Sequence, residues 1–135
     1  MNGNVILWLR ISYWTGAVLD LLAGLIMLFP ALFALNNQLS GFAPTPAYRY
    51  AMGMGAPLML GWTVLLVWAD RKPLERRGIL PITLLVIFGL VINEIVAART
   101  GFIPTAALIP TWFLQILLTS LYAFSFWNAG KARAK

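Results

Sequence analysis

The chain has 135 residues, of which 61% are hydrophobic and 10% are charged, and it carries a net charge of +6. Because soluble domains have about a quarter of their residues charged, this composition excludes an ordinary soluble domain and indicates an integral membrane protein. There is no Cys and no His, which excludes disulfides, thiol chemistry and zinc or haem ligation through these residues, so we expect no metal or cofactor. The basic residues flank apolar segments, which argues against nucleic acid as a partner.

Four continuous apolar segments are each long enough to cross a bilayer as a helix of about 20 residues. They cover about residues 11–29, 50–68, 79–98 and 108–127. The first is too long for a secretion signal, so we expect it to be retained, and Pro30 ends or kinks it. The predicted fold is an all-α integral membrane four-helix bundle that forms a single domain over residues 1–135.

Lys and Arg are distributed unequally between the two sides of this predicted bundle. Two of the ten, Arg49 and Arg99, lie on one side. The other eight are Arg10, Arg71, Lys72, Arg76, Arg77, Lys131, Arg133 and Lys135. Because cytoplasmic loops are enriched in cations, we expect a multi-pass protein of the inner (cytoplasmic) membrane with both termini cytoplasmic.

The segment 70–78 between the second and third spans gathers charges of both signs, and we name it the hinge. Its four cations, Arg71, Lys72, Arg76 and Arg77, are expected to attract anionic lipid head groups. Asp70 and Glu75 alternate with these cations, so weak, solvent-screened ion pairs are expected here.

An internal repeat links the two predicted external loops. Residues 40–47 read SGFAPTPA and residues 100–107 read TGFIPTAA. Duplication of a two-helix hairpin would explain the match and would relate the halves by an axis along the membrane normal. Two tight turns that converge on the same turn residues would explain it equally well.

Asp20 lies near the middle of the first span. It follows Arg10 by ten residues, which is about 15 Å of helix in a hydrocarbon layer about 30 Å thick. A carboxyl group at this depth is expected to face the bundle interior and to be protonated or paired. It falls on a stripe with Ser12, Gly16 and Gly24 that permits close helix approach. Asp20 is therefore either a proton or ligand site or a buried carboxyl that holds helices together.

Asn93, Glu94 and Gln115 are the other polar residues expected inside the bundle. Glu94 and Asn93 lie toward the outer end of the third span, and Gln115 shares a helical face with Thr111, Thr119 and Tyr122. Arg49 could reach Glu94 or could remain an interfacial anchor. We expect the depths of Asp20 and Glu94 in the membrane to differ by about 10 Å, so the two acids should not form a close pair.

The region Tyr48–Thr83 contains a Tyr-Arg-Tyr start, a Met-Gly-Met-Gly-Ala-Pro run, Gly-Trp-Thr and a Trp-Ala-Asp-Arg-Lys-Pro-Leu-Glu-Arg-Arg-Gly hinge. It resembles small four-span bacterial membrane proteins of unassigned function, and the resemblance implies no catalytic residues. Small multidrug exporters are similar in having four spans and an acid in the first. They differ in their shorter chains, their shorter external loop and their weaker charge bias. Sterol isomerases also use intramembrane acids, but their motifs are missing here.

The first functional hypothesis is a module that binds or transports a lipid-like or small cationic ligand in the bundle interior. The alternative is an accessory or structural subunit that packs against another membrane protein or a second copy. A third hypothesis is an intramembrane enzyme that uses Asp20 or Glu94. Catalytic residues are unknown, and an enzyme is less expected because neither acid has an evident nucleophile, metal or cofactor beside it.

Overall fold

The computed structural model describes residues 3–133, with side chains described for residues 3–131. Its helices are α1 (Gly3–Leu28), α2 (Pro30–Asn36), α3 (Pro46–Asp70), α4 (Ile79–Arg99) and α5 (Thr105–Arg133). All except α2 are long and apolar enough to cross a membrane. The predicted four-helix membrane fold is confirmed, and α2 is an additional short helix. Lys135 and the side chain of Arg133, both counted in the charge asymmetry, lie outside the described residues.

The long helices extend beyond the apolar segments that predicted them. α1 begins at Gly3, about two turns before the apolar segment, and α5 continues to Arg133. Once a helix has started, each further residue adds one hydrogen bond, so polar turns can continue the helix into the membrane interface.

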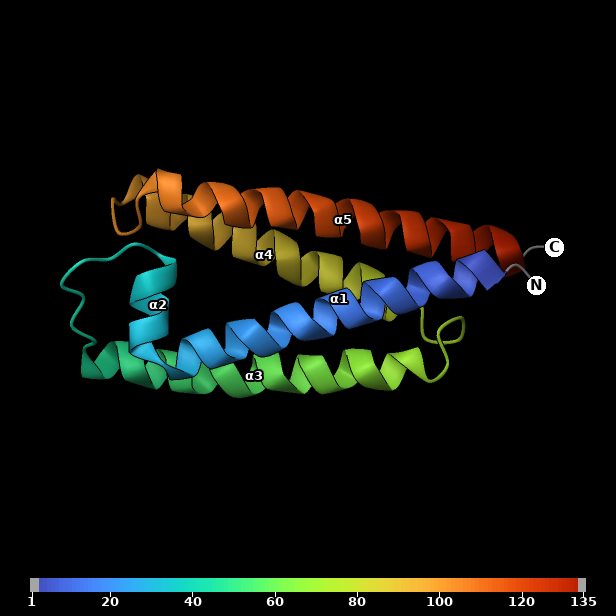
Figure 1. Cartoon of the computed structure of the whole chain (residues 1–135), viewed down its shortest axis with the longest axis horizontal. Coiled ribbons are helices and arrows are strands. Elements are labelled where there is room, and N and C mark those ends of the chain that lie inside the picture. Colours follow the sequence, from blue (N-terminus) through green and yellow to red (C-terminus); the bar gives the residue numbers. More distant parts are fainter. Residues whose placement is uncertain (1–2, 134–135) are drawn as a thin grey trace.

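Pro30 separates α1 from α2. Phe29 has an extended backbone, with φ −113° and ψ 99°, because the proline ring disfavours the helical conformation in the residue before it. The segment after Pro30 is thus a new helix rather than a bent continuation of α1. In Figure 1, α2 stands across the direction of the long helices.

The long helices form two antiparallel hairpins, α1 with α3 and α4 with α5 (Figure 1). The hairpins meet where α1 begins and α5 ends, and α1 contacts α5 there. From that end they diverge toward the end that carries α2. The main buried cluster follows this arrangement. It contains Leu9, Tyr13, Ala17, Leu66, Ala69, Leu80, Ile87, Tyr122 and Ala129.

Glycines on α1 permit the close packing around this cluster. A side chain at Gly16 would overlap the Tyr122 hydroxyl of α5 and would lie 2.9 Å from Leu66 Cδ1 of α3. A side chain at Gly24 would lie 3.0 Å from Leu60 Cδ2, also on α3. The small-residue stripe predicted on the first span is therefore a packing surface.

The two repeated loops have matching backbones. Gly41 and Gly101 have φ values of +73° and +72°, in the left-handed region that glycine adopts without strain. Four residues later, Thr45 caps α3 by accepting a hydrogen bond from Tyr48 N–H at 3.1 Å, and Thr105 begins α5.

Four aromatic residues, which we call the aromatic clasp, join these loops to α2. The Phe33 ring of α2 lies 5.5 Å from Phe42, 5.2 Å from Tyr48 and 6.5 Å from Phe102, measured between ring centroids. Phe42 and Phe102 occupy equivalent positions of the repeat. The clasp thus connects the two hairpins at the end where their helices diverge.

Asp70 connects the hinge to α1, whereas the sequence predicted only a weak, solvent-screened ion pair for this residue. Trp14 Nε1 donates to Asp70 Oδ2 at 3.2 Å, and Arg10 Nε lies 3.4 Å from Asp70 Oδ1. The Asp70 side chain is 18% exposed, so the expected solvent-screened pair is corrected to a partly buried contact that connects α3 to α1. Lys72 and Glu75, 3.0 Å apart and both exposed, do form the expected kind of pair.

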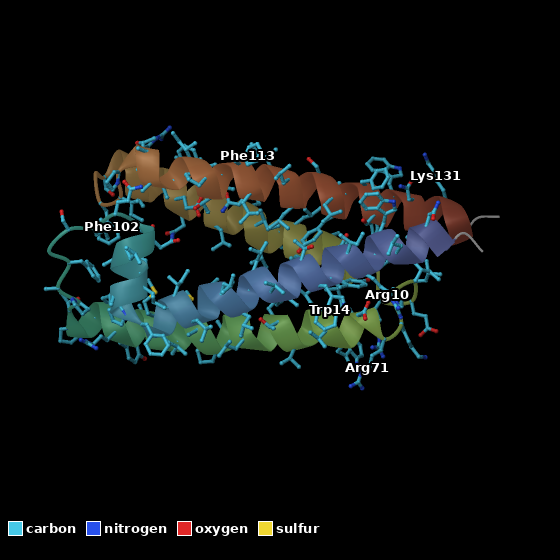
Figure 2. The ribbon with its side chains drawn as sticks, in the orientation of Figure 1. Arg10, Trp14, Arg71, Phe102, Phe113 and Lys131 are labelled. Carbon is cyan, nitrogen blue, oxygen red and sulfur yellow. The ribbon has the colours of Figure 1, made fainter. Side chains whose placement is uncertain are left out.

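The basic residues gather at the hinge end of the molecule. Arg10, Arg71 and Lys131 lie toward this end, whereas Phe102 lies at the opposite end (Figure 2). Arg76 lies over the Trp68 ring, 3.3 Å from its centroid, and donates to the Trp68 carbonyl oxygen. Arg49 lies in the first turn of α3, at the opposite end.

Candidate functional site

A buried polar contact joins the two helices of the second hairpin. Gln115 Nε2 donates a hydrogen bond of 3.1 Å to Glu94 Oε1. The Gln115 side chain is buried and Glu94 is half-buried. Gln115 lies about 15 Å along α5 from its start, and Glu94 lies little more than one turn before the end of α4. The contact between these two predicted site residues is therefore within the apolar length of both helices.

Three buried polar atoms around this contact have no hydrogen-bond partner within the part of the chain that the structure describes. They are Glu94 Oε2, Gln115 Oε1 and Trp112 Nε1. Trp112 faces the Glu94 carboxyl group without reaching hydrogen-bond geometry. Unsatisfied polar atoms in a buried place are costly, so this cluster has unused capacity to bind polar groups.

A groove of about 480 Å³ runs beside the Glu94–Gln115 contact, between α4 and α5. Its walls are Val91, Ile95, Trp112, Gln115, Ile116, Thr119 and Ser120. Ile95, Ile116 and Ser120 are exposed, so the groove opens on the surface of the hairpin. The walls are mostly apolar, and Gln115 contributes a buried polar side chain.

Comparisons of the chain with protein-family models, curated proteins and solved structures find no match.

The functional argument therefore depends on the arrangement of the side chains. A carboxyl group, an amide and an indole beside an apolar groove form a site that can bind a polar head and an apolar body together.

Asp20 lies apart from the groove, on the first hairpin. It is half-buried, and its Oδ2 atom is buried without a hydrogen-bond partner among residues 3–131. Its titratable neighbour is Tyr122 of α5, whose hydroxyl lies against Gly16, one turn before Asp20. Asp20 and Glu94 thus belong to separate sites.

The two remaining predicted site residues lie outside both sites. Asn93 is exposed, and the pocket beside the Glu94–Gln115 contact is not lined by it. Arg49 is exposed in the first turn of α3, and neither ion pair of the described residues includes it.

Sequence reasoning missed two residues, one at the Glu94–Gln115 contact and one at the contact between α1 and α5. Trp112 was not singled out, although it lies one turn before Gln115. Ser125 lies one turn after Tyr122, and its hydroxyl lies 2.8 Å from that of Ser12. Both hydroxyls are within hydrogen-bond distance of the Trp8 carbonyl oxygen, at 2.9 and 3.2 Å. Continuing the polar stripe of the fourth span by one turn past Tyr122 would have indicated Ser125, and the position three residues before Gln115 would have indicated Trp112.

Proposed function

We propose that this chain binds an amphipathic molecule with a cationic head group in the α4–α5 groove. The observation that carries the proposal is the pair of buried acceptors beside the groove, Glu94 Oε2 and Gln115 Oε1, that have no hydrogen-bond partner among the described residues. A protonated amine supplies donors and no acceptor, and its positive charge complements an ionised Glu94. This chemistry fits the acceptors better than an anionic head group does.

The apolar body of the molecule would lie along Val91, Ile95 and Ile116. The groove volume of about 480 Å³ is within the usual range of about 300–1,000 Å³ for small-molecule sites. Both acceptor atoms are buried, so binding requires a rim side chain such as Trp112 to turn. Transport of the same molecule across the membrane is the stronger form of this proposal.

The test measures binding of dodecylammonium to the full chain in lipid nanodiscs by calorimetry, with dodecanol as the uncharged probe. We expect Glu94→Gln to weaken dodecylammonium binding about tenfold or more, because hydrogen bonds to charged groups contribute about 1.5–3 kcal/mol. Glu75→Gln is the matched control, since Glu75 is exposed on the hinge. Equal affinity in Glu94→Gln and the unchanged protein, or dodecanol binding as tight as that of the amine, would contradict the proposal.

We infer that the host membrane is the inner (cytoplasmic) membrane and that the hinge end of the bundle is cytoplasmic. The support is the gathering of Arg10, the hinge cations and Lys131 at that end. The chain lacks Cys, so single cysteines report the orientation directly. From outside intact cells, a membrane-impermeant thiol reagent should label Ser40→Cys and not Glu75→Cys; the reverse pattern would overturn the orientation.

The hinge cations are also proposed to contact anionic lipid head groups. Arg71 is exposed and outside both ion pairs of the described residues, whereas Arg77 lies 5.6 Å from the Phe126 ring centroid. Arg71 is therefore the hinge cation best placed for a head group.

A second candidate function is an accessory subunit, and one feature of α3 favours it. Gly53, Pro57 and Gly61 recur at spacings of four on an exposed face, and a side chain added at either glycine would meet nothing within 4 Å. Small residues at this spacing allow another helix to approach closely. Extraction in mild detergent should then retain a stoichiometric partner or a second copy. A stable lone monomer that binds dodecylammonium would argue against this function.

A further inference from the structure

Asp20 lies at the junction of the two hairpins, where α5 separates from α1. On one side of it along α1, Gly16 packs against Tyr122 of α5 and Leu66 of α3. On the other side, the atoms nearest to a side chain added at Gly24 belong to Leu60 and the Ala56 carbonyl of α3. Asp20 shares the stripe of these two glycines and lies between the contact with α5 at Gly16 and the contact with α3 at Gly24.

Within residues 3–131, no cation lies within ion-pair distance of Asp20. Its Oδ2 atom is buried and unpartnered, and the titratable side chain that faces it from α5 is Tyr122. On α3 and α4 the other ionisable groups lie toward the helix ends. They are Tyr48, Arg49, Tyr50, Asp70, Glu94 and Arg99.

A carboxylate in these surroundings would be a bare charge inside an apolar layer. Such a charge costs several kcal/mol, whereas a protonated carboxyl group needs only one acceptor for its O–H. We propose that Asp20 is a proton-binding site at the junction of the two hairpins, separate from the α4–α5 groove. The carboxylate takes one proton from water and becomes a neutral acid, and release of that proton leaves a charge between α1 and α5.

The α1–α5 contact is therefore coupled to protonation. With the proton bound, the junction is neutral and the helices stay packed through Gly16, Tyr122 and the Ser12–Ser125 contact. With the proton released, the charge draws water into the junction and weakens the packing. By linkage, a neutral acid that folding favours contributes stability below its titration range, and this stability is lost as pH rises.

The first experiment is infrared spectroscopy of the full chain in lipid vesicles. We expect the unchanged protein at neutral pH to show a carbonyl band of a protonated carboxylic acid, which shifts in D₂O. This band should be missing in Asp20→Asn and retained in Glu94→Gln, the matched control on α4. An unchanged band in Asp20→Asn would overturn the proposal.

The second experiment measures how the thermal stability of the protein depends on pH. The thermal stability of the unchanged protein should fall as pH is raised above about 4, where an aspartate in the unfolded chain titrates, and the fall should be smaller in Asp20→Asn, which resembles the protonated state. The same fall in both proteins would contradict a proton site at Asp20. Dodecylammonium binding at neutral pH depends on Glu94 and should survive Asp20→Asn, so failure of this proposal is distinguishable from failure of the binding proposal.

Discussion

The two hairpins differ in how closely their helices pack against each other. α1 and α3 lie in contact along most of their length, and their interface is made of small residues such as Ala17, Gly24 and Ala56. α4 and α5 touch less extensively and are joined by the Glu94–Gln115 hydrogen bond beside an open groove. Small residues allow backbones to approach, whereas larger side chains hold helices apart and leave space between them.

The glycines make the same contrast. Substitution at Gly16 or Gly24 of α1 would bring a new Cβ within 3.0 Å or less of a neighbouring side chain, whereas at Gly89 of α4 it would meet nothing within 4 Å. α1 is thus tightly packed against α3 and α5 at these positions, whereas Gly89 of α4 has open space beside it. Three substitutions test this difference.

The largest effect is expected from Gly16→Ala. The added methyl would overlap the Tyr122 hydroxyl and press on Leu66, so both neighbours must shift. Overpacking of this kind costs about 1–3 kcal/mol. Gly89→Ala is the same substitution in the looser hairpin, where the helix preference for alanine should leave stability unchanged or raise it by up to about 1 kcal/mol. Reversible unfolding in mixed micelles measures both. An equal loss of unfolding free energy in the two variants would contradict the difference in packing between the hairpins.

A smaller effect is expected at the aromatic clasp. Phe102→Ala removes the contact between Phe33 and the second hairpin, whereas Phe42→Ala removes the equivalent contact inside the first. Each should cost about 0.5–1.5 kcal/mol, the usual contribution of an aromatic pair. The distances between spin labels at Leu39→Cys and Thr100→Cys should broaden in Phe102→Ala more than in Phe42→Ala. Similar broadening in both would mean that the clasp does not hold the hairpins together.

The smallest effect is expected at the hinge. Arg10→Gln removes the cation beside Asp70 but leaves the Trp14 hydrogen bond to the same carboxylate. Because Arg10 is 56% exposed, the loss should be about 0.2–1 kcal/mol and should shrink as salt is added. Unfolding at low and high salt measures it, with Lys72→Gln as the control on the exposed Lys72–Glu75 pair. A loss that does not change with salt would contradict an ion-pair contribution.

Polar residues inside long apolar segments were predictable as buried, because a charge or amide in lipid must turn inward. Gln115 and Glu94 satisfied this expectation, and their shared helical faces made contact between the two spans plausible. Asn93 did not, because it is exposed. Neighbouring residues on a helix are separated by about 100°. Two adjacent polar residues therefore point in different directions, and of this pair Glu94 is the one that meets Gln115.

The sequence showed that the loop motif occurs twice, but it did not show where the two copies lie in the structure. Matching φ values at Gly41 and Gly101 give the two loops the same backbone role, and Phe42 and Phe102 meet at Phe33. Phe33 belongs to α2, which has no counterpart in the second hairpin. A sequence match reports which residues recur, whereas their meeting point depends on an element outside the repeat.

The sequence by itself determined the membrane fold, because four long apolar segments in a chain with few charges have no other stable arrangement than helices in lipid. It also determined that Asp20 and Glu94 would be the costly residues. Tertiary structure decided that these acids belong to two sites, that Asp70 is held by α1, and that the groove lies on one hairpin. Those features depend on which side chains meet when helices far apart in the sequence pack together, and the order of residues along the chain does not specify that.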